Sequence, residues 1–328
     1  MFKTIFVEES IQHHPRSLEI ISKVKSKNIE VVNSYTEIFG KVKKPYLQKR
    51  DNLNLFIAQK KGDLVKEAPP AYGTKGERHF YFIHSYNCIY ECQYCYLQGY
   101  FKSPDLVFFI NHEEILKEIE SVAKINPNAW FHAGEFSDSL ALSHITNELD
   151  LYFDFFRHNK NLKLEIRTKS SNIRELIKLD PSENIFITYS LSPLKISKEI
   201  DLKTPPLISK LNCIKELYQQ GYKVGIHFDP ITLTKTWEAD YKDLLNELNN
   251  HVPIKDISFF SLGVVRFTKE VFEVFKRNYP NSSILKEDFV TSFDQKVRYP
   301  KPVRMKYLNA LKEMIKKMGN ENAYLCME

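Results

Sequence analysis

Six short apolar segments alternate with longer periodic segments from residue 79 onward, and no other feature restricts the possible folds as strongly. The apolar segments lie near residues 79–84, 129–134, 163–167, 185–191, 222–228 and 256–262. Strands that alternate with helices in this way form βαβ units around a parallel sheet. The sequence therefore predicts an α/β protein built on six parallel strands.

The segments between these strands have the spacing of amphipathic helices. Ile115 and Ile119 lie on one face of a helix for which Asn111 and Glu114 are expected to form a capping box. Two more apolar faces comprise Leu142, Ile145, Leu149, Tyr152 and Phe156, and Leu207, Leu211, Ile214 and Tyr218. Each face predicts a helix that packs against the sheet.

Both ends of the chain add smaller units. A strand at 3–7, a helix near 16–27 and a strand at 29–33 predict a small N-terminal α/β extension. A basic and aromatic segment followed by a helix ends the chain. The expected units are 1–75, 76–290 and 291–328.

Three of the five cysteines lie within eight residues, directly after the first predicted strand of the parallel sheet. Cys88, Cys92 and Cys95 are spaced four and three residues apart, and Tyr94 precedes the last. A loop with this spacing can bind three irons of a [4Fe–4S] cube through thiolates and leave the fourth without a protein ligand. A cofactor can bind to this fourth iron.

Two other uses of these cysteines stay open. A structural zinc site needs four ligands, so the three cysteines would require a fourth such as His84 or His132. A disulfide framework is typical of short secreted chains, whereas this chain has five cysteines among 328 residues.

The cysteine loop resembles that of the radical S-adenosylmethionine superfamily, whose signature is C-x-x-x-C-x-aromatic-C. Residues 92–98 more narrowly resemble the spore photoproduct lyase family. The resemblance implies an incomplete (β/α)6 barrel and a [4Fe–4S] cluster that binds S-adenosylmethionine and yields a 5′-deoxyadenosyl radical. In barrels of this type, chemistry takes place at the carboxyl ends of the strands.

The same resemblance implies cofactor-binding residues at the other strand ends. Gly134-Glu135 is similar to a motif that binds the methionine amino group, although the lyases have a hydrogen-donating cysteine where Glu135 stands. Lys169 matches a lysine that pairs with the cofactor carboxylate. The remaining candidates are Ser137, Asp138, Ser190, Ser192, His227 and Asp229. Ordinary turns and helix caps would explain several of them equally well.

Three residues are candidates for the radical chemistry itself. The resemblance implies that Tyr94 contacts adenine and that Tyr94 and Tyr96 take part in hydrogen transfer. A carboxylic O–H bond is too strong for Glu135 to replace the missing thiol, so Cys326 near the C-terminus is a candidate hydrogen donor. An inert buried cysteine is the alternative.

Residues 291–307 combine five basic residues with three aromatic ones. Cations bind phosphates and rings stack on bases, as a protein that binds damaged DNA requires. The expected nucleic-acid contacts are Lys296, Arg298, Tyr299, Lys301, Arg304, Lys306 and Tyr307. A solvated basic loop is the alternative.

The whole-chain properties limit the setting in which this protein acts. A formal net charge of +6 is compatible with a polyanionic partner but does not require one. No apolar run approaches the roughly 18 residues of a membrane span, and the first residues lack the apolar segment of a signal peptide. We expect a cytoplasmic monomer that receives electrons from a donor such as flavodoxin or ferredoxin.

These features predict a radical lyase that repairs a thymine or other pyrimidine photoproduct in DNA. The resemblance implies removal of a hydrogen atom from C6 of the lesion, fragmentation of its methylene bridge, and return of a hydrogen atom to the product radical. One alternative is a radical enzyme that modifies another base or RNA. A second is a nucleic-acid-binding module in which the cluster is structural and no 5′-deoxyadenosine forms.

Overall fold

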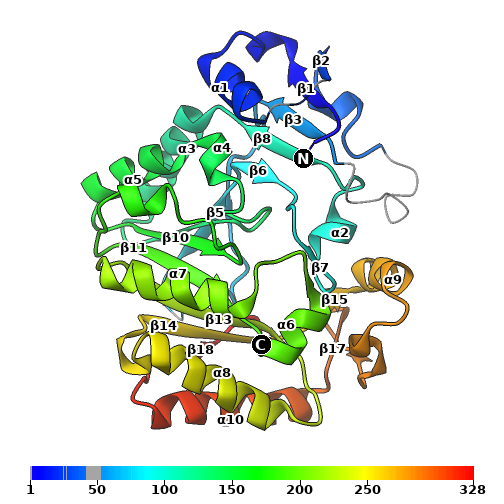
Figure 1. The fold of residues 1–328 in the computed structure, drawn as a ribbon, viewed down its shortest axis with the longest axis vertical. Coiled ribbons are helices and arrows are strands. Elements are labelled where there is room, and N and C mark those ends of the chain that lie inside the picture. The colour runs from blue at the N-terminus through cyan, green and yellow to red at the C-terminus, as the bar shows by residue number, and fades with distance from the viewer. Residues whose placement is uncertain (1, 25, 27, 42–52, 75) are drawn as a thin grey trace.

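The computed structural model describes residues 2–24, 26, 28–41, 53–74 and 76–328 (Figure 1). A small N-terminal sheet lies at the top of Figure 1, and a larger curled sheet covered by helices lies below it. The site described below lies at the carboxyl end of the larger sheet.

The larger sheet contains all six predicted parallel strands, so the prediction of an incomplete parallel barrel is confirmed. It also contains a seventh parallel strand, β18, which pairs with β14, and an antiparallel edge strand, β4, which pairs with β5. In spatial order the strands are β18 (Ala323–Leu325), β14 (Phe259–Val264), β13 (Lys223–Ile231), β11 (Ile185–Ser190), β10 (Lys163–Thr168), β9 (Trp130–Ala133), β5 (His79–Phe82) and β4 (Val65–Glu67).

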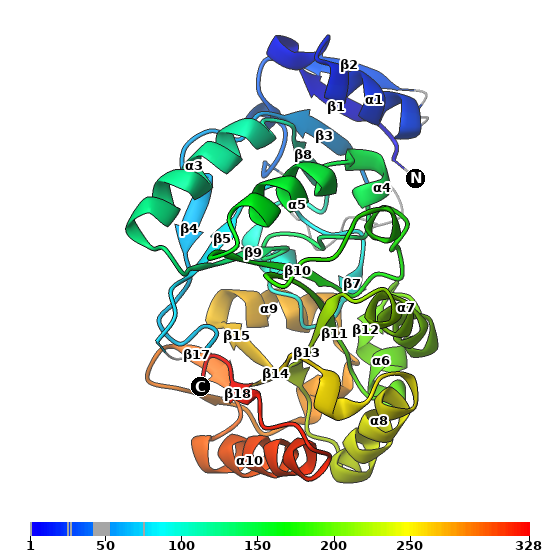
Figure 2. The same ribbon diagram turned by 90° about the vertical axis from the view of Figure 1, so that its left-hand side faces the viewer.

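Amphipathic helices cover the outer face of this sheet (Figure 2). The main ones are α3 (His112–Ile125), α5 (Leu149–His158), α7 (Leu207–Gln219), α8 (Trp237–His251) and α10 (Lys301–Lys317). In α3, Ile115 and Ile119 are fully buried in the cluster that the helices form with the sheet. Burying a side chain of this size contributes about 1.5–3 kcal/mol. The apolar faces of α3, α5 and α7 therefore pack against the sheet as expected. Leu142 and Ile145 of the second predicted face instead pack in the apolar cluster of the N-terminal sheet.

Two details of these helices differ from the prediction. The side chain of Asn111 does not cap α3; it accepts from Lys60 N at 2.8 Å and donates to Glu114 Oε2 at 2.6 Å. The segment expected to form one helix from residue 142 to 156 is divided into α4 (Ser143–Thr146) and α5. The division occurs at Asn147, whose φ of 57° is left-handed and ends α4.

The N-terminal sheet has the strand order β2-β1-β3-β8-β6. Its members are β1 (Ile5–Glu8), β2 (Ile29–Val32), β3 (Leu55–Ala58), β6 (Ser85–Tyr86) and β8 (Leu106–Phe109), and α1 (Pro15–Val24) precedes β2. Glu8 is buried at its centre, where its two carboxylate oxygens accept from Tyr35 N and Gln59 N at 3.0 Å each. Because β6 and β8 come from beyond residue 76, this sheet crosses the first expected division of the chain.

A second small sheet lies beside the barrel and crosses the other expected division. It has the order β15-β17-β16 and comprises β15 (Arg266–Thr268), β16 (Val290–Thr291) and β17 (Lys296–Arg298). Between β15 and β16 runs α9 (Lys269–Asn278), for which Thr268 is the N-cap. The described strands cross both expected boundaries. The division of the chain into three units stays a prediction.

A further helix, α6 (Leu194–Ile200), follows β11. Short 3-10 helices lie at Glu9–Ile11, Tyr35–Glu37, Leu176–Lys178, Ile254–Asp256 and Ser283–Lys286. None of the helices among the described residues has both the length and the apolar character needed to cross a membrane.

Two isoleucines of α3 provide a direct test of how the helix layer stabilises the sheet. Ile119→Ala is expected to lower the free energy of unfolding by about 2–5 kcal/mol, because it leaves a cavity against the sheet. Ile125→Ala, at a position that is 83% exposed, should change it by less than about 0.5 kcal/mol. Urea unfolding followed by circular dichroism measures both, and equal effects would show that Ile119 does not anchor the helix.

Candidate active site

The cysteine loop begins beyond the carboxyl end of β5 and is held by backbone pairing. Within it, β7 (Glu91–Cys92) pairs with β12 (Asp201–Leu202), and α2 (Leu97–Tyr100) follows directly. Cys95 N donates to Cys92 O at 3.0 Å, and Tyr90 N donates to the sulfur of Cys88 at 3.4 Å. Hydrogen bonds to sulfur of this kind also tune iron–sulfur clusters.

Two glutamines fix the loop to the rest of the molecule. Gln93 Nε2 donates to Glu199 O at 3.0 Å, beside β12. Gln98 Nε2 donates to Cys92 O at 2.7 Å, and its Oε1 accepts from Tyr279 OH at 3.1 Å, just beyond α9. The cysteines are therefore presented by a loop that is tied to α9 and β12.

The donor set of this loop fits a cluster better than a zinc ion. Both ring nitrogens of His132 are used by Glu165 and His79, and those of His84 face Glu148 and Ser137. Among the described residues, no three histidine, cysteine or carboxylate side chains form a single-ion site. A cube binds each thiolate to a different iron, so its sulfurs need not meet at one point. None of the five cysteines, all of which the structure describes, forms a disulfide.

The segment after β9 turns sharply toward the loop. Gly134 has a φ of +90°, and a Cβ there would lie 2.5 Å from Ser139 Oγ, so only glycine fits. Ser137 Oγ lies 3.3 Å from His84 Nε2. Asp138 accepts four hydrogen bonds, from Leu140 N, Ala141 N, Thr168 Oγ1 and Lys169 N. The carboxylate of Asp138 therefore holds the ends of β9 and β10 together.

Lys169 and Tyr94 lie side by side. Lys169 Nζ is 5.6 Å from the centroid of the Tyr94 ring, whose hydroxyl donates to Asp201. Burial, reinforced by Asp201, raises the pKa of Tyr94 well above its usual value. Lys210 is fully buried nearby, and its Nζ has no hydrogen-bond partner among the described residues.

The remaining predicted cofactor residues also lie at strand ends. Ser190 and Ser192, at the end of β11, are 6% and 1% exposed. His227 Nε2 bonds to Glu165 Oε1 at 2.5 Å. Asp229 forms a two-pronged ion pair with Arg266, at 3.1 and 3.2 Å. Burial raises the pKa of Asp229, but Arg266 outweighs this and lowers it overall.

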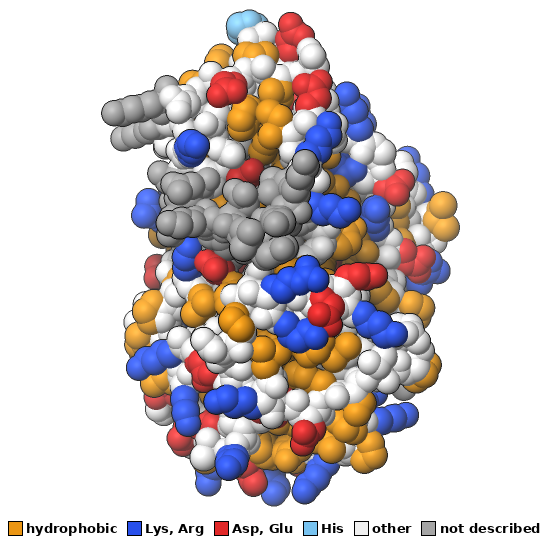
Figure 3. Space-filling model, turned by 90° about the vertical axis from the view of Figure 1, so that its right-hand side faces the viewer, with side chains coloured by type: hydrophobic (Ala, Val, Ile, Leu, Met, Phe, Trp, Pro, Cys, Tyr) orange, Lys and Arg blue, Asp and Glu red, His pale blue; other side chains and the backbone are white. Residues whose placement is uncertain are grey.

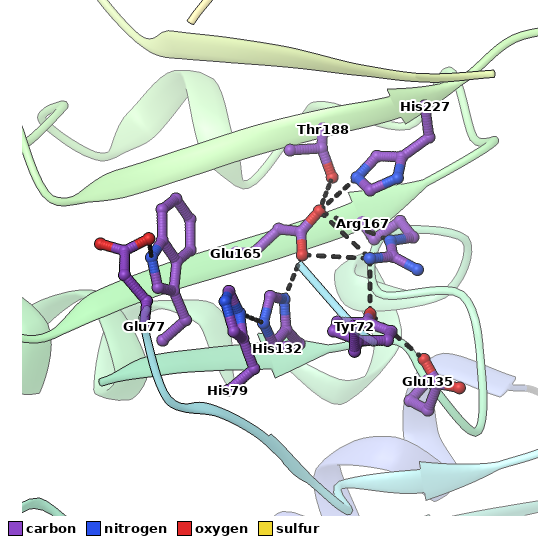
Figure 4. Close-up of polar contacts among 10 residues, drawn as sticks. Tyr72, Glu77, His79, His132, Glu135, Glu165, Arg167, Thr188 and His227 are labelled. Atoms are coloured by element: carbon purple, nitrogen blue, oxygen red, sulfur yellow. Dashed lines mark hydrogen bonds and ion pairs between the residues drawn. The ribbon is translucent and has the colours of Figure 1, made fainter. Parts of the chain in front are cut away.

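A buried polar network fills the inside of the barrel below these strand ends (Figure 4). At its centre lies Glu165 on β10, which is 1% exposed and contacts His132, His227, Thr188 and Arg167. Burial alone would raise the pKa of Glu165, but these partners, led by Arg167, lower it well below its usual value. Glu165 is therefore a buried anion with four partners.

The network continues toward the cysteine loop through two tyrosines. Arg167 Nη2 donates to Tyr72 OH at 2.6 Å, and Tyr72 OH lies 3.4 Å from Glu135 Oε2 (Figure 4). Tyr96 OH donates to Glu135 O at 2.5 Å and lies 3.4 Å from Glu135 Oε1. Glu135 thus links Tyr96 of the loop to Tyr72 of the barrel interior.

Cys326 lies at the carboxyl end of β18 and so at the same end of the sheet. It is 4% exposed and packs with Tyr72 and Ala68, and its N–H donates to Leu262 O at 2.8 Å. Cys213, by contrast, lies in α7 and donates to Ser171 O at 3.4 Å. Of the two cysteines outside the loop, only Cys326 is beside the candidate site.

The predicted nucleic-acid contacts divide into buried and exposed residues. Arg298 is 3% exposed and pairs with Asp294, while Arg304 is 5% exposed and pairs with Glu328. Tyr299 is 2% exposed and accepts from Leu233 N at 2.9 Å. The more accessible members of the set are Lys296, Lys301, Lys306 and Tyr307, of which Tyr307 packs against Trp237. On the side that α9 occupies in Figure 1, basic side chains are interspersed with acidic ones (Figure 3).

Three residues of the buried polar network were not predicted from the sequence, namely Tyr72, Glu165 and Arg167. Tyr72 lies in the segment between β4 and β5, before the first residue of β5. No site residue was expected there, because the site was predicted at the carboxyl ends of the strands. Met327 N donates to Ala71 O at 2.9 Å, so this segment closes the open edge of the sheet beside β18. One sequence pattern could have indicated Glu165 and Arg167. Charged residues at alternate positions of an otherwise apolar strand lie on the same face of the sheet.

An incomplete parallel barrel whose first parallel strand leads into a three-cysteine loop with this spacing defines a radical S-adenosylmethionine protein. The spore photoproduct lyase family model matches residues 1–323. The chain therefore belongs to the spore photoproduct lyase family.

Known proteins of this family resemble the chain over most of its length. It is 24% identical over 287 residues to spore photoproduct lyase of Bacillus subtilis, covering 85% of this chain and 83% of that protein. It is 22% identical over 299 residues to the Clostridium acetobutylicum enzyme, covering 89% and 87%. A solved spore photoproduct lyase variant with bound AdoMet and dinucleoside spore photoproduct has a TM-score of 0.84 at 19% identity, covering 99% of this chain and 98% of that chain. Another solved variant, with the dinucleoside spore photoproduct, has a TM-score of 0.86 with the same coverage.

Removing the central charge of the network should destabilise the barrel. Glu165→Gln is expected to lower the free energy of unfolding at pH 7 by about 3–5 kcal/mol, because Arg167 and the histidines lose their buried partner. The folded pKa of Glu165 is lowered, so its contribution is complete above its unfolded pKa of about 4.3 and is lost as the pH falls below that value.

Urea unfolding of both proteins between pH 3 and 7 measures this effect. The difference between them should shrink in the acid part of the range. Glu183→Gln is the control, because Glu183 is 88% exposed and pairs only at the surface with Lys223, at 2.8 Å. It should change stability by less than about 1 kcal/mol. A difference for Glu165→Gln that is equally small would contradict the central role of Glu165.

Proposed function

We propose that this protein is a radical S-adenosylmethionine lyase that repairs the spore photoproduct in DNA. The observation that carries the proposal is the placement of Cys88, Cys92 and Cys95 at the carboxyl end of β5, in a chain that matches the lyase family over residues 1–323. The solved relative that contains AdoMet together with the dinucleoside lesion supports the same cofactor and substrate.

The residues around the loop fit such a cofactor. When bound, a [4Fe–4S] cluster with S-adenosylmethionine on its open iron supplies a 5′-deoxyadenosyl radical. Cys88, Cys92 and Cys95 would hold the other three irons. Lys169 provides a positive charge for the methionine carboxylate, and the ring of Tyr94 beside it provides a face for adenine.

The other predicted cofactor residues divide into two groups. Ser137, Ser190 and Ser192 place hydroxyl groups at the strand ends, where they can bond the ribose or the methionyl group. His227 and Asp229 are tied to Glu165 and Arg266, and Asp138 joins β9 to β10. We assign these last three to positioning the strand ends around the cofactor.

The hydrogen atom that the product radical requires has two candidate donors in this chain. Tyr96 lies at the end of the cysteine loop with its hydroxyl on Glu135, and Cys326 packs against Tyr72 just after β18. Glu135 occupies the position of the family cysteine and cannot donate a hydrogen atom itself. We therefore assign the donation to Tyr96, with Cys326 as a more distant source.

DNA that contains the lesion is the proposed partner. Lys296, Lys301 and Lys306 are the basic residues whose side chains remain available for phosphates, whereas Arg298 and Arg304 are paired within the protein. Tyr307 stays a candidate for a contact with a base or sugar. A flavodoxin or ferredoxin as reductant, a monomeric state and a cytoplasmic location stay predictions.

Anaerobic reconstitution tests the function directly. The native protein should bind about four irons per chain, form 5′-deoxyadenosine when reduced with S-adenosylmethionine, and convert dinucleoside spore photoproduct to thymidine. Cys92→Ala should lose at least tenfold in both products, because one iron loses its thiolate. Chromatography of both products measures this outcome.

Cys213→Ala, at a buried cysteine outside the loop, is the matched control and should keep the cluster. If 5′-deoxyadenosine forms without lesion repair, the protein is a radical enzyme for another base or RNA. If the reduced protein forms no 5′-deoxyadenosine, it is a binding module.

The exposed lysines at the start of α10 give a separate prediction about DNA binding. Replacing Lys301 and Lys306 together by alanine should weaken binding to duplex DNA and reduce the salt slope by about 0.9 for each lost phosphate contact. Fluorescence anisotropy at several salt concentrations measures the slope. Lys124→Ala, an exposed lysine of α3, should leave it unchanged. An unchanged slope in the double variant would place this segment outside the DNA interface.

A further inference from the structure

Glu135 lies where two tyrosine hydroxyl groups approach one carboxylate. Its Oε1 is 3.4 Å from Tyr96 OH, and its Oε2 is 3.4 Å from Tyr72 OH. Tyr96 belongs to the cysteine loop, whereas Tyr72 belongs to the segment that closes the open edge of the sheet. One carboxylate therefore connects phenols from two separate parts of the chain.

Arg167 directs the hydroxyl hydrogen of Tyr72 toward this carboxylate. Arg167 Nη2 donates to the Tyr72 oxygen at 2.6 Å, and a guanidinium group can only donate. The phenol has one hydrogen of its own, for which Glu135 Oε2 is the acceptor. Arg167 is held in turn by Glu165 at 3.2 Å, so it acts as a positioning residue.

Burial keeps the phenol of Tyr72 in the form that a hydrogen donor needs. Tyr72 is 9% exposed, and its ring packs edge-on against His132 with centroids 5.0 Å apart. Burial raises the pKa of Tyr72 well above the usual value for tyrosine. Its side chain therefore retains an O–H bond at neutral pH.

We propose that Tyr72 is a further hydrogen-transfer residue, which restores an oxidised Tyr96 through the carboxylate of Glu135. The inference rests on the proposed function, in which Tyr96 gives its hydroxyl hydrogen to the radical left on the cleaved lesion. The neutral Tyr96 radical that this leaves is the species that Tyr72 reduces.

The transfer balances in electrons and protons. One electron passes from Tyr72 to the Tyr96 radical, and the phenolic proton of Tyr72 moves to Glu135 Oε2. A turn of the carboxyl group about its last side-chain torsion, which has no sharp preference, brings that proton to the Tyr96 oxygen. The O–H bond of Tyr72 breaks, that of Tyr96 forms again, and Glu135 returns to its starting state.

The path also gives Cys326 a defined place. Cys326 packs with Tyr72 and is separated from Tyr96 by both Tyr72 and Glu135. In the proposed order Cys326, Tyr72, Glu135, Tyr96, the S–H group of Cys326 would be the hydrogen source for an oxidised Tyr72. The sequence alone could not supply this order, because it pointed to Tyr96 and Cys326 without a connection between them.

Tyr72→Phe tests the proposal because it removes only the hydroxyl group. With dinucleoside spore photoproduct, the variant should form 5′-deoxyadenosine within about twofold of the native amount. Its yield of thymidine per 5′-deoxyadenosine should fall about tenfold, with side products of the lesion radical in its place. Tyr222→Phe is the matched control, since Tyr222 is also buried and donates to Leu176 O and Leu179 O outside the barrel interior.

A spectroscopic measurement separates radical transfer from structural support. With 3-aminotyrosine at position 72, an aminotyrosyl radical should be trapped and detected by electron paramagnetic resonance in samples frozen during turnover. The same substitution at position 222 should give no such signal. In Tyr72→Phe, the added change Glu135→Cys should restore the thymidine yield to within about threefold, because a thiol there donates directly.

The outcomes distinguish a failure of the Tyr72 relay from a failure of the proposed lyase function. A native thymidine yield in Tyr72→Phe, or no radical at position 72, would overturn the relay while leaving the lyase function intact. A yield that stays low in the double variant would assign the loss to a distorted site and overturn the relay as well. If the native protein repairs no spore photoproduct, the proposed function fails, and the relay fails with it.

Discussion

The buried charge of Glu165 is the interaction on which the polar interior of the barrel depends. A carboxylate that is 1% exposed is tolerated only if its oxygens are satisfied, and here Thr188, two histidines and Arg167 do so. The consequence extends beyond Glu165, because the guanidinium of Arg167 is thereby fixed in position. Arg167 in turn sets the direction of the Tyr72 hydroxyl.

The two faces of the sheet differ in function, since one packs against helices and the other faces the interior of the barrel. Successive residues of a strand point to opposite faces, so the two sets of side chains stay separate. On β10, Leu164 and Ile166 face the helices and are almost fully buried, while Glu165 and Arg167 face the interior. Parallel strands usually read as continuous apolar runs because both faces are covered by helices. In an incomplete barrel the inner face lines the site, so it can carry polar groups at full burial.

Much of the fold could be predicted because the six parallel strands are local apolar runs separated by amphipathic helices. That β18 joins them as a seventh strand could not be predicted, since Ala323–Leu325 is only three residues long and its place in the sheet follows from its pairing with β14. The N-terminal sheet was predicted only in part, because β6 and β8 come from the chain after β5. Pairing between segments far apart in sequence has no local signal.

The placement of candidate residues could be predicted where they follow a strand, while their roles stay predictions. Lys169 beside Tyr94 is such a case, and so is the position of Glu135 beyond β9. Composition alone did not predict which residues of the basic segment are exposed. A count of charges does not distinguish exposed lysines from Arg298 and Arg304, which are paired with acids of their own chain. Tyr72 shows a second limit, since its segment reaches the site only by folding across the open edge of the sheet.

Because the barrel is open at one edge, the segments that close this edge can contribute residues to the site without disturbing the strands that face the cofactor. A closed barrel draws its active-site residues from loops beyond the strand ends, and each of these loops is constrained by two neighbours. Here the edge between β4 and β18 is closed by residues 68–74 and by the C-terminus, which meet at the hydrogen bond from Met327 N to Ala71 O. These two segments contribute Tyr72 and Cys326, and neither belongs to the strands that carry Glu135 or Lys169. Changes in hydrogen transfer can therefore arise at the edge while the cysteine loop and its neighbouring strand ends keep their geometry.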